Sequence, residues 1–139
     1  MTESKTYDKP LPVLDDGNRP FWTATRERQL ALQHCDECGK PRYPINHVCP
    51  HCLCDRFEWK PVSGRGTVHS SIVFHQVYNP AYAGDVPYNV SLIQLEEGPR
   101  MISNVVGIPP AEVKVGDPVQ VVFDPVTPDI SIPRFERVA

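Results

Sequence analysis

The second half of the chain carries five short runs rich in hydrophobic, β-branched and aromatic residues, separated by Gly, Pro, Asn and Asp. Runs bounded in this way predict β-strands joined by turns. Five strands over about 75 residues, with a long first connection, are typical of a small Greek-key barrel of the OB type. The predicted strands cover residues 67–77, 89–95, 101–106, 118–123 and 130–135.

Two connections support this count of strands. The sequence Glu-Glu-Gly-Pro at 96–99 predicts a hairpin turn between the second and third strands. Residues 108–117 predict a longer crossing with one helical turn, which ends at a Gly-Asp turn before the fourth strand. Both connections fit the order of strands in an OB barrel.

The pattern before residue 67 is different. Residues 1–19 are polar and contain several prolines, so we expect an extended arm. Pro20 begins a predicted helix of about ten residues, since Pro is favoured in a first helical turn. Phe21 and Trp22 are predicted to anchor this helix, either by packing against the rest of the chain or by facing a partner. On one face of the helix we place Phe21, Ala24, Arg28 and Ala31.

Between helix and barrel, the segment CDECGKPRYPINHVCPHC contains two C-x-x-C pairs separated by ten residues. Four thiolates in tetrahedral array suit zinc, and a site with four protein ligands has no position left for water or substrate. The spacing therefore predicts a structural zinc ion in a zinc ribbon. Residues 57–62 form its closing strand, and residues 63–66 turn into the barrel. The predicted ligands are Cys35, Cys38, Cys49 and Cys52.

Alternatives for this cluster remain open. The four cysteines also fit a metal-free buried group, a dithiol redox pair or bound iron. His34, His47 and His51 lie close enough in sequence to replace a cysteine as ligand. Cys54 comes two residues after Cys52, too near to form another such pair, and we interpret it as a partly buried thiol without a role.

Composition limits the classes of function. The chain has 139 residues, 16 of them proline, and a net charge of -3 with 14 basic and 17 acidic residues. Because nucleic-acid binding relies on clustered Lys and Arg, this balance argues against a nucleic-acid partner. No apolar leader and no run of 18 apolar residues is found, so we expect a cytoplasmic protein without a membrane span.

The sequence also lacks the common catalytic signatures. We find no H-E-x-x-H, G-x-S-x-G, P-loop or dinucleotide fingerprint, and no carboxylate pair with a spacing that suggests acid–base work. His75 is interpreted as a histidine at a strand end. The sequence Gly64-Arg65-Gly66 is interpreted as a turn and not as a phosphate site. We therefore expect no independent active site.

The first barrel connection contains three tyrosines stiffened by prolines. Tyr78, Tyr82 and Tyr88 either cap the barrel mouth or contact a partner protein or acyl-CoA, since aromatic residues are favoured at interfaces. With Phe21 and Trp22, they complete the set of candidate contact residues.

The chain resembles one family along nearly its whole length: zinc-ribbon and OB-fold proteins, formerly a domain of unknown function, that accompany thiolase-like enzymes. The resemblance rests on Phe21-Trp22, the CDECG and CPHC pairs, and the segments GRGTVHSSIVFH, VPYNVSLIQLEEGPRMISNVVG and VKVGDPVQVVFDPV. It implies a mainly β chain with an arm and short helix, a rubredoxin-like zinc ribbon and a five-stranded OB barrel. We place these parts at 1–30, 31–62 and 63–139.

The resemblance also implies a function. Members look like non-catalytic subunits that pair with thiolases, acyl-CoA synthases or side-chain aldolases, hold the complex together and help to bind acyl-CoA. Two other classes stay open: a nucleic-acid-binding module, because ribbons and OB barrels occur in such proteins, and a stand-alone hydrolase or acyl-CoA carrier.

Overall fold

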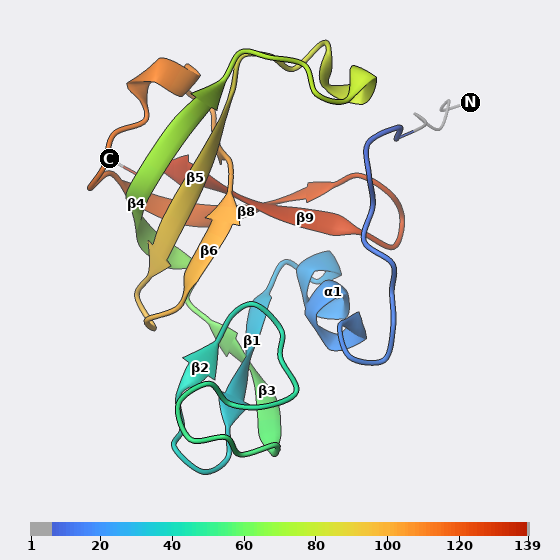
Figure 1. The fold of residues 1–139 in the computed structure, drawn as a ribbon, viewed down its shortest axis with the longest axis vertical. Coiled ribbons are helices and arrows are strands. Elements are labelled where there is room, and N and C mark those ends of the chain that lie inside the picture. Colours follow the sequence, from blue (N-terminus) through green and yellow to red (C-terminus); the bar gives the residue numbers. More distant parts are fainter. Residues whose placement is uncertain (1–6, 139) are drawn as a thin grey trace.

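The computed structural model describes residues 7–138 and contains two β-sheets and one α-helix. The arm leads into α1 (Arg19–Arg26), followed by a three-stranded ribbon and a barrel (Figure 1). The ribbon strands are β1 (Leu30–Cys35), β2 (Pro41–Arg42) and β3 (Phe57–Val62), in the order β2-β1-β3. In Figure 1 the ribbon lies below the barrel, and α1 lies beside the junction of the two.

The barrel confirms the predicted OB topology. Its sheet has the order β6-β5-β4-β8-β9-β7. Short 3₁₀ turns, η1 (Pro80–Tyr82) and η2 (Pro110–Glu112), interrupt two of the connections, and η2 supplies the helical turn expected in the crossing. The strands are β4 (Arg65–Phe74), β5 (Tyr88–Leu95), β6 (Arg100–Ser103), β7 (Val105–Val106), β8 (Pro118–Pro125) and β9 (Ser131–Arg137).

The predicted third strand is interrupted. Its first half, β6, pairs antiparallel with β5, and its second half, β7, pairs parallel with β9. The break at Asn104 thus separates the two end strands of the sheet, β6 and β7, which follow each other in the chain. The buried side chain of Asn89 fixes this break, because its amide donates to the carbonyl of Val105 and its oxygen accepts from the Val105 amide at 2.8 Å.

The helix prediction was correct in its start and wrong in its end. α1 ends at Arg26, and Arg28 has a φ of 61°, in the left-handed region that terminates helices. Ala31 therefore lies on β1 and not on the helical face. Phe21 and Ala24 do share the buried face of α1.

One hydrophobic core connects all parts of the chain. Phe21 of α1 and Leu30 and Leu32 of β1 belong to the same buried cluster as the barrel interior. The predicted division at 1–30, 31–62 and 63–139 therefore stays a prediction, because the ribbon and barrel share their core. The barrel members of this cluster are Val68, Ile93, Leu95, Met101, Val105, Val119 and Phe135.

The junction between ribbon and barrel is the predicted turn at 63–66. Gly64 has a φ of 75°, and a β-carbon built there would lie 2.2 Å from Val121 Cγ1, so only glycine fits. A phosphate site at this turn would need the positive charge of Arg65. The side chain of Arg65 instead forms an ion pair with Glu96 at 3.2 Å. The interpretation as a turn agrees with this geometry.

Candidate metal centre and partner surface

The first cysteine pair lies on a tight turn at the end of β1. The amide of Glu37 donates to the sulfur of Cys35 at 3.4 Å, and the amide of Gly39 donates to the Cys35 carbonyl at 3.0 Å. Gly39 has a φ of 75°, which glycine adopts without steric cost. The turn therefore aims the sulfurs of Cys35 and Cys38 to one side.

The second pair repeats the same turn. The amide of His51 donates to the sulfur of Cys49 at 3.4 Å, and the amide of Leu53 donates to the Cys49 carbonyl at 2.9 Å. Leu53 takes the position that Gly39 has in the first turn, with a φ of 67° and its side chain exposed. The second turn thus keeps the geometry of the first, although leucine replaces the glycine that adopts a positive φ without steric cost.

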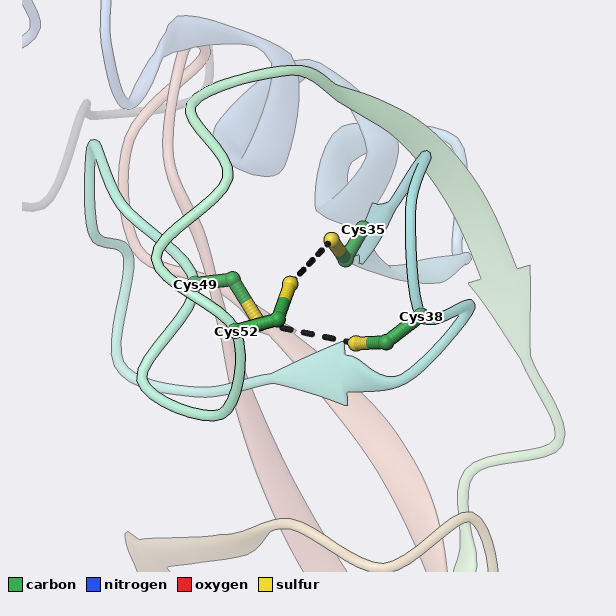
Figure 2. A group of neighbouring side chains, drawn as sticks. All are labelled: Cys35, Cys38, Cys49 and Cys52. Carbon is green, nitrogen blue, oxygen red and sulfur yellow. Dashed lines mark hydrogen bonds between the residues drawn. The ribbon is translucent and has the colours of Figure 1, made fainter.

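The four predicted sulfurs converge on one point (Figure 2). All lie within 4.8 Å of one another, with 3.4 Å between Cys35 and Cys52 and 3.6 Å between Cys38 and Cys49. Two sulfurs bound to one tetrahedral zinc lie about 3.8 Å apart, because each Zn–S bond is about 2.3 Å. The donor set and its spacing fit a structural zinc ion.

The charges of the thiols also call for a cation. The backbone amides of Cys38 and Glu37 outweigh burial and lower the pKa of Cys35 to about 6. At Cys49, burial raises the pKa, but the amides of His51 and Cys52 lower it by more. At Cys52, the amide of Cys54 lowers the pKa, but hydrogen bonds with Cys35 and burial raise it to about 12. The raised pKa of Cys52 beside the lowered pKa values of Cys35 and Cys49 reflects the crowding of these sulfurs, and a bound cation would favour their thiolate forms.

Other side chains near the cluster stay outside it. Within residues 7–138, the group with metal-ligand spacing consists of the four cysteines alone. His34 Nδ1 lies 3.1 Å from the carbonyl of Leu32, and His47 and His51 are exposed. The sulfur of Cys54 accepts the amide of Arg56 at 3.4 Å. The site needs no fifth ligand, and its closed geometry suits a structural role.

Four of the five candidate aromatic residues line one cavity of about 800 Å³. Phe21 and Trp22 form one part of its wall, edge to face with ring centres 5.0 Å apart. Tyr82 and Tyr88 form another part, with ring centres 5.7 Å apart. Tyr78 is not part of the lining and is 73% exposed. The structure thus brings together residues 60 positions apart in sequence but separates Tyr78 from them.

Sequence reasoning missed the charged part of this cavity. Lys9 of the arm pairs with Asp85 at 2.9 Å and lies over the Tyr82 ring at 5.5 Å. Arg134 of β9 pairs with Asp124 at 2.9 Å. All four residues line the cavity. No local motif marks such contacts, because they join distant segments of the chain.

Sequence reasoning also missed an exposed hydrophobic surface on the barrel. In β5, burial alternates strictly, so Val90 and Leu92 face outward. Ile72 pairs with Val90, and Ile102 pairs with Leu92, on the three strands β4, β5 and β6, which lie side by side (Figure 1). Ile72 is 58% and Ile102 67% exposed. We call these four residues the apolar sheet face.

Aromatic side chains continue the apolar sheet face at one end. The ring of Phe74 stacks on Tyr88 at 5.4 Å and meets Tyr78 edge to face at 6.1 Å. Exposed apolar surface of this extent on a folded chain is typical of a protein-binding site. Tyr78 therefore belongs with this face and not with the cavity.

Comparison with known proteins places the chain in a family. Residues 22–58 match the rubredoxin-like zinc ribbon domain of ChsH2, and residues 59–124 match the C-terminal OB-fold domain of ChsH2. A DUF35 domain-containing scaffold protein of Methanocaldococcus jannaschii is 33% identical over 104 residues, which cover 73% of each chain. The chain belongs to the ChsH2/DUF35 family. Its predicted ribbon, OB fold and structural zinc are confirmed by this membership and by the cysteine cluster.

Other members of the ChsH2/DUF35 family carry more specific names. A probable enoyl-CoA hydratase alpha subunit of Thermomonospora curvata is 36% identical over 91% of this chain, which spans only 39% of that relative. The benzoylsuccinyl-CoA thiolase subunit BbsA of Thauera aromatica is 29% identical, with 78% of this chain and 77% of BbsA covered. Among solved structures, the Ltp2-ChsH2(DUF35) aldolase is 32% identical with a TM-score of 0.83, covering 93% of this chain and all of that one.

No helix within the described residues has the length and hydrophobicity needed to cross a membrane.

Proposed function

We propose that this chain is a non-catalytic accessory subunit of a thiolase-like enzyme complex that acts on CoA thioesters. The observation that carries the proposal is the apolar sheet face, on a chain that is similar to a thiolase subunit and to a chain of the Ltp2-ChsH2(DUF35) aldolase. A second supporting observation is the closed zinc centre, which has no position for substrate. In this proposal the catalytic groups belong to the partner, and the complex works in the cytoplasm.

The apolar sheet face is the proposed contact with that partner. It carries no charged residue, and the neighbouring cation, Arg100, donates to the side chain of Gln94 at 2.8 Å. A buried, uncharged centre is typical of stable protein interfaces. A nucleic-acid interface would instead need free cations along this face, as in other OB barrels. We therefore favour a protein partner with an apolar patch over the nucleic-acid alternative.

The substitution Ile102→Asp is expected to weaken the complex about 30-fold or more, because it places a charge in the apolar sheet face. The measurement is co-purification of the chain with candidate thiolase-like proteins from the same genome, followed by the dissociation constant of the complex. Val115→Asp is the matched control, since Val115 is 71% exposed and lies in the connection between η2 and β8, not on β4, β5 or β6, and we expect it to leave binding unchanged.

Three outcomes would contradict all or part of this proposal. If none of the thiolase-like proteins binds the wild-type chain, the partner class is wrong. If an enoyl-CoA hydratase binds in their place, the hydratase alpha subunit is the better guide to function. If a thiolase-like protein binds equally well to Ile102→Asp and to the wild-type chain, the partner stands but the docking face is wrong.

We also propose that the cavity contacts acyl-CoA when the complex is assembled. Its walls are aromatic and apolar, as suits an acyl or pantetheine group, and Lys9 and Arg134 add cationic edges. Each cation is already paired with a carboxylate. The isolated chain therefore has little free positive charge for phosphates, and we expect the partner to complete the site.

Calorimetry with acetyl-CoA and benzoyl-CoA tests this arrangement. The isolated chain is expected to bind with a dissociation constant of about 0.1 mM or weaker, and the complex at least about tenfold more tightly. In the complex, Tyr82→Ala should weaken acyl-CoA binding, because Tyr82 lines the cavity, whereas Val115→Asp should not, because Val115 is not part of the lining. Tight binding by the isolated chain would show instead a carrier that acts without a partner.

A further inference from the structure

The ribbon contains a buried cation without an anionic partner. Arg42 of β2 is 4% exposed, and no carboxylate among the described residues forms an ion pair with it. Its Nε and one terminal nitrogen donate to the carbonyl of Asn46 at 3.1 and 2.8 Å, and its other terminal nitrogen is buried and has no hydrogen-bond partner within residues 7–138. Since burying an unpaired charge is strongly unfavourable, Arg42 needs negative charge from elsewhere.

The sheet register places Arg42 on the same face of the ribbon as Cys35. Arg42 pairs with Gln33 on β1, and Cys35 lies two residues further along that strand. Paired residues share a face, as do residues two apart, so the two side chains are diagonal neighbours, with α-carbons about 7–8 Å apart. The guanidinium also lies 4.9 Å from the ring centre of Phe57, which is the register partner of Cys35.

We propose that Arg42 offsets the negative charge of the four-thiolate metal centre and thereby strengthens zinc binding. Zinc with four thiolate ligands carries a net charge of -2, because the ion supplies two of the four opposing charges. The dianion attracts a buried cation on the same face of the ribbon, and it supplies the missing partner of Arg42. Arg42 is thus a positioning residue of the site and not a ligand.

Arg42 has a second contact that the test must separate from its charge. The Asn46 carbonyl lies in the segment between the two cysteine pairs, so the paired hydrogen bonds from Arg42 also hold this segment in place. Lysine keeps the charge but loses the two-pronged geometry. Glutamine keeps one side-chain amide donor but loses the charge, and methionine loses both.

The experiment measures metal affinity of the full chain by competition with a chelator, for zinc, and by the thiolate-to-metal absorption bands, for cobalt. We expect Arg42→Met and Arg42→Gln to bind about 10 to 100-fold more weakly, the usual effect of losing an outer-shell partner. Arg42→Lys should stay within about threefold of wild type. Arg56→Met is the matched control, because Arg56 lies in the same ribbon with its side chain 70% exposed, and we expect no change.

Three results would overturn the proposal. Unchanged affinity in Arg42→Met would show that the metal centre does not need the charge. A loss in Arg42→Lys equal to that in Arg42→Gln would assign the effect to the contact with Asn46. A loss of the same size in Arg56→Met would show a general effect of positive charge. If Arg42→Met does not fold even with zinc, the metal affinities of Arg42→Lys and Arg42→Gln are compared instead. Equal losses of affinity in these two variants would overturn the proposal.

Discussion

Replacement of Cys49 by serine is expected to abolish stable zinc binding and to unfold the ribbon. Cys49 is fully buried, and its sulfur lies 3.6 Å from that of Cys38, so the substitution replaces a thiolate inside the cluster with a hydroxyl, which is a poor ligand for zinc. Structural zinc contributes about 10 kcal/mol or more of apparent binding free energy, which is comparable to the whole stability of a domain. Without the free energy of zinc binding, the ribbon has only three short strands and too few buried side chains to stay folded.

The extent of unfolding is itself informative. Leu30 and Leu32 belong to both the ribbon and the shared core, so we expect loss of zinc to loosen the barrel wall that they cover. The measurements are zinc content by mass spectrometry and amide hydrogen exchange along β1 to β3. We expect protection in these strands to disappear while β4 and β5 keep part of theirs.

Cys54→Ser provides the matched control for this experiment. Cys54 lies two residues from Cys52 but outside the sulfur cluster, so we expect full zinc content and a stability within about 0.5 kcal/mol of wild type. A Cys49→Ser variant that keeps one zinc ion and a protected ribbon would contradict the assignment of ligands. Equal losses in both variants would indicate that Cys54 also belongs to the site.

Local signals allowed the metal centre and most strands to be predicted. A C-x-x-C spacing fixes its own turn, because the amides that follow each first cysteine donate to its sulfur, as Glu37 and His51 do. β3 coincides with the predicted closing strand at 57–62, and the turn at 96–99 joins β5 to β6 as expected. Each of these features depends on residues adjacent in sequence.

The errors arose where distant residues decide the structure. The helix ends at Arg26 because the following residues form β1, where Leu30 and Leu32 pack in the core shared with the barrel. The third barrel strand breaks at Asn104 because Asn89, fifteen positions away, holds the backbone of Val105. Propensity along the chain contains no sign of either contact.

The same distinction applies to the candidate surfaces. The sequence shows that the first barrel connection is rich in tyrosine and proline. Which tyrosines line the cavity, Tyr82 and Tyr88 but not Tyr78, depends on how η1 folds. The apolar sheet face requires the register of β4 against β5 and of β5 against β6, which the sequence pattern does not specify. The burial of Arg42 likewise depends on how β2 packs in the ribbon, which no local pattern specifies.

Replacement of Phe21 by alanine is expected to lower the free energy of unfolding by about 3 to 5 kcal/mol. The ring is 3% exposed and packs in the cluster that joins α1, β1 and the barrel, with Tyr43 at 6.2 Å between ring centres. Its loss leaves a void at the junction of three elements. Urea unfolding of the zinc-loaded chain measures the change.

Tyr78→Ala is the comparison that separates packing from partner contact. Tyr78 is 73% exposed, so its removal should change stability by less than about 0.5 kcal/mol while it weakens the proposed complex. Phe21→Leu should lie between wild type and Phe21→Ala, because leucine fills part of the same space. If Phe21→Ala costs less than about 1 kcal/mol but weakens the complex as Tyr78→Ala does, then Phe21 serves the partner and not the core.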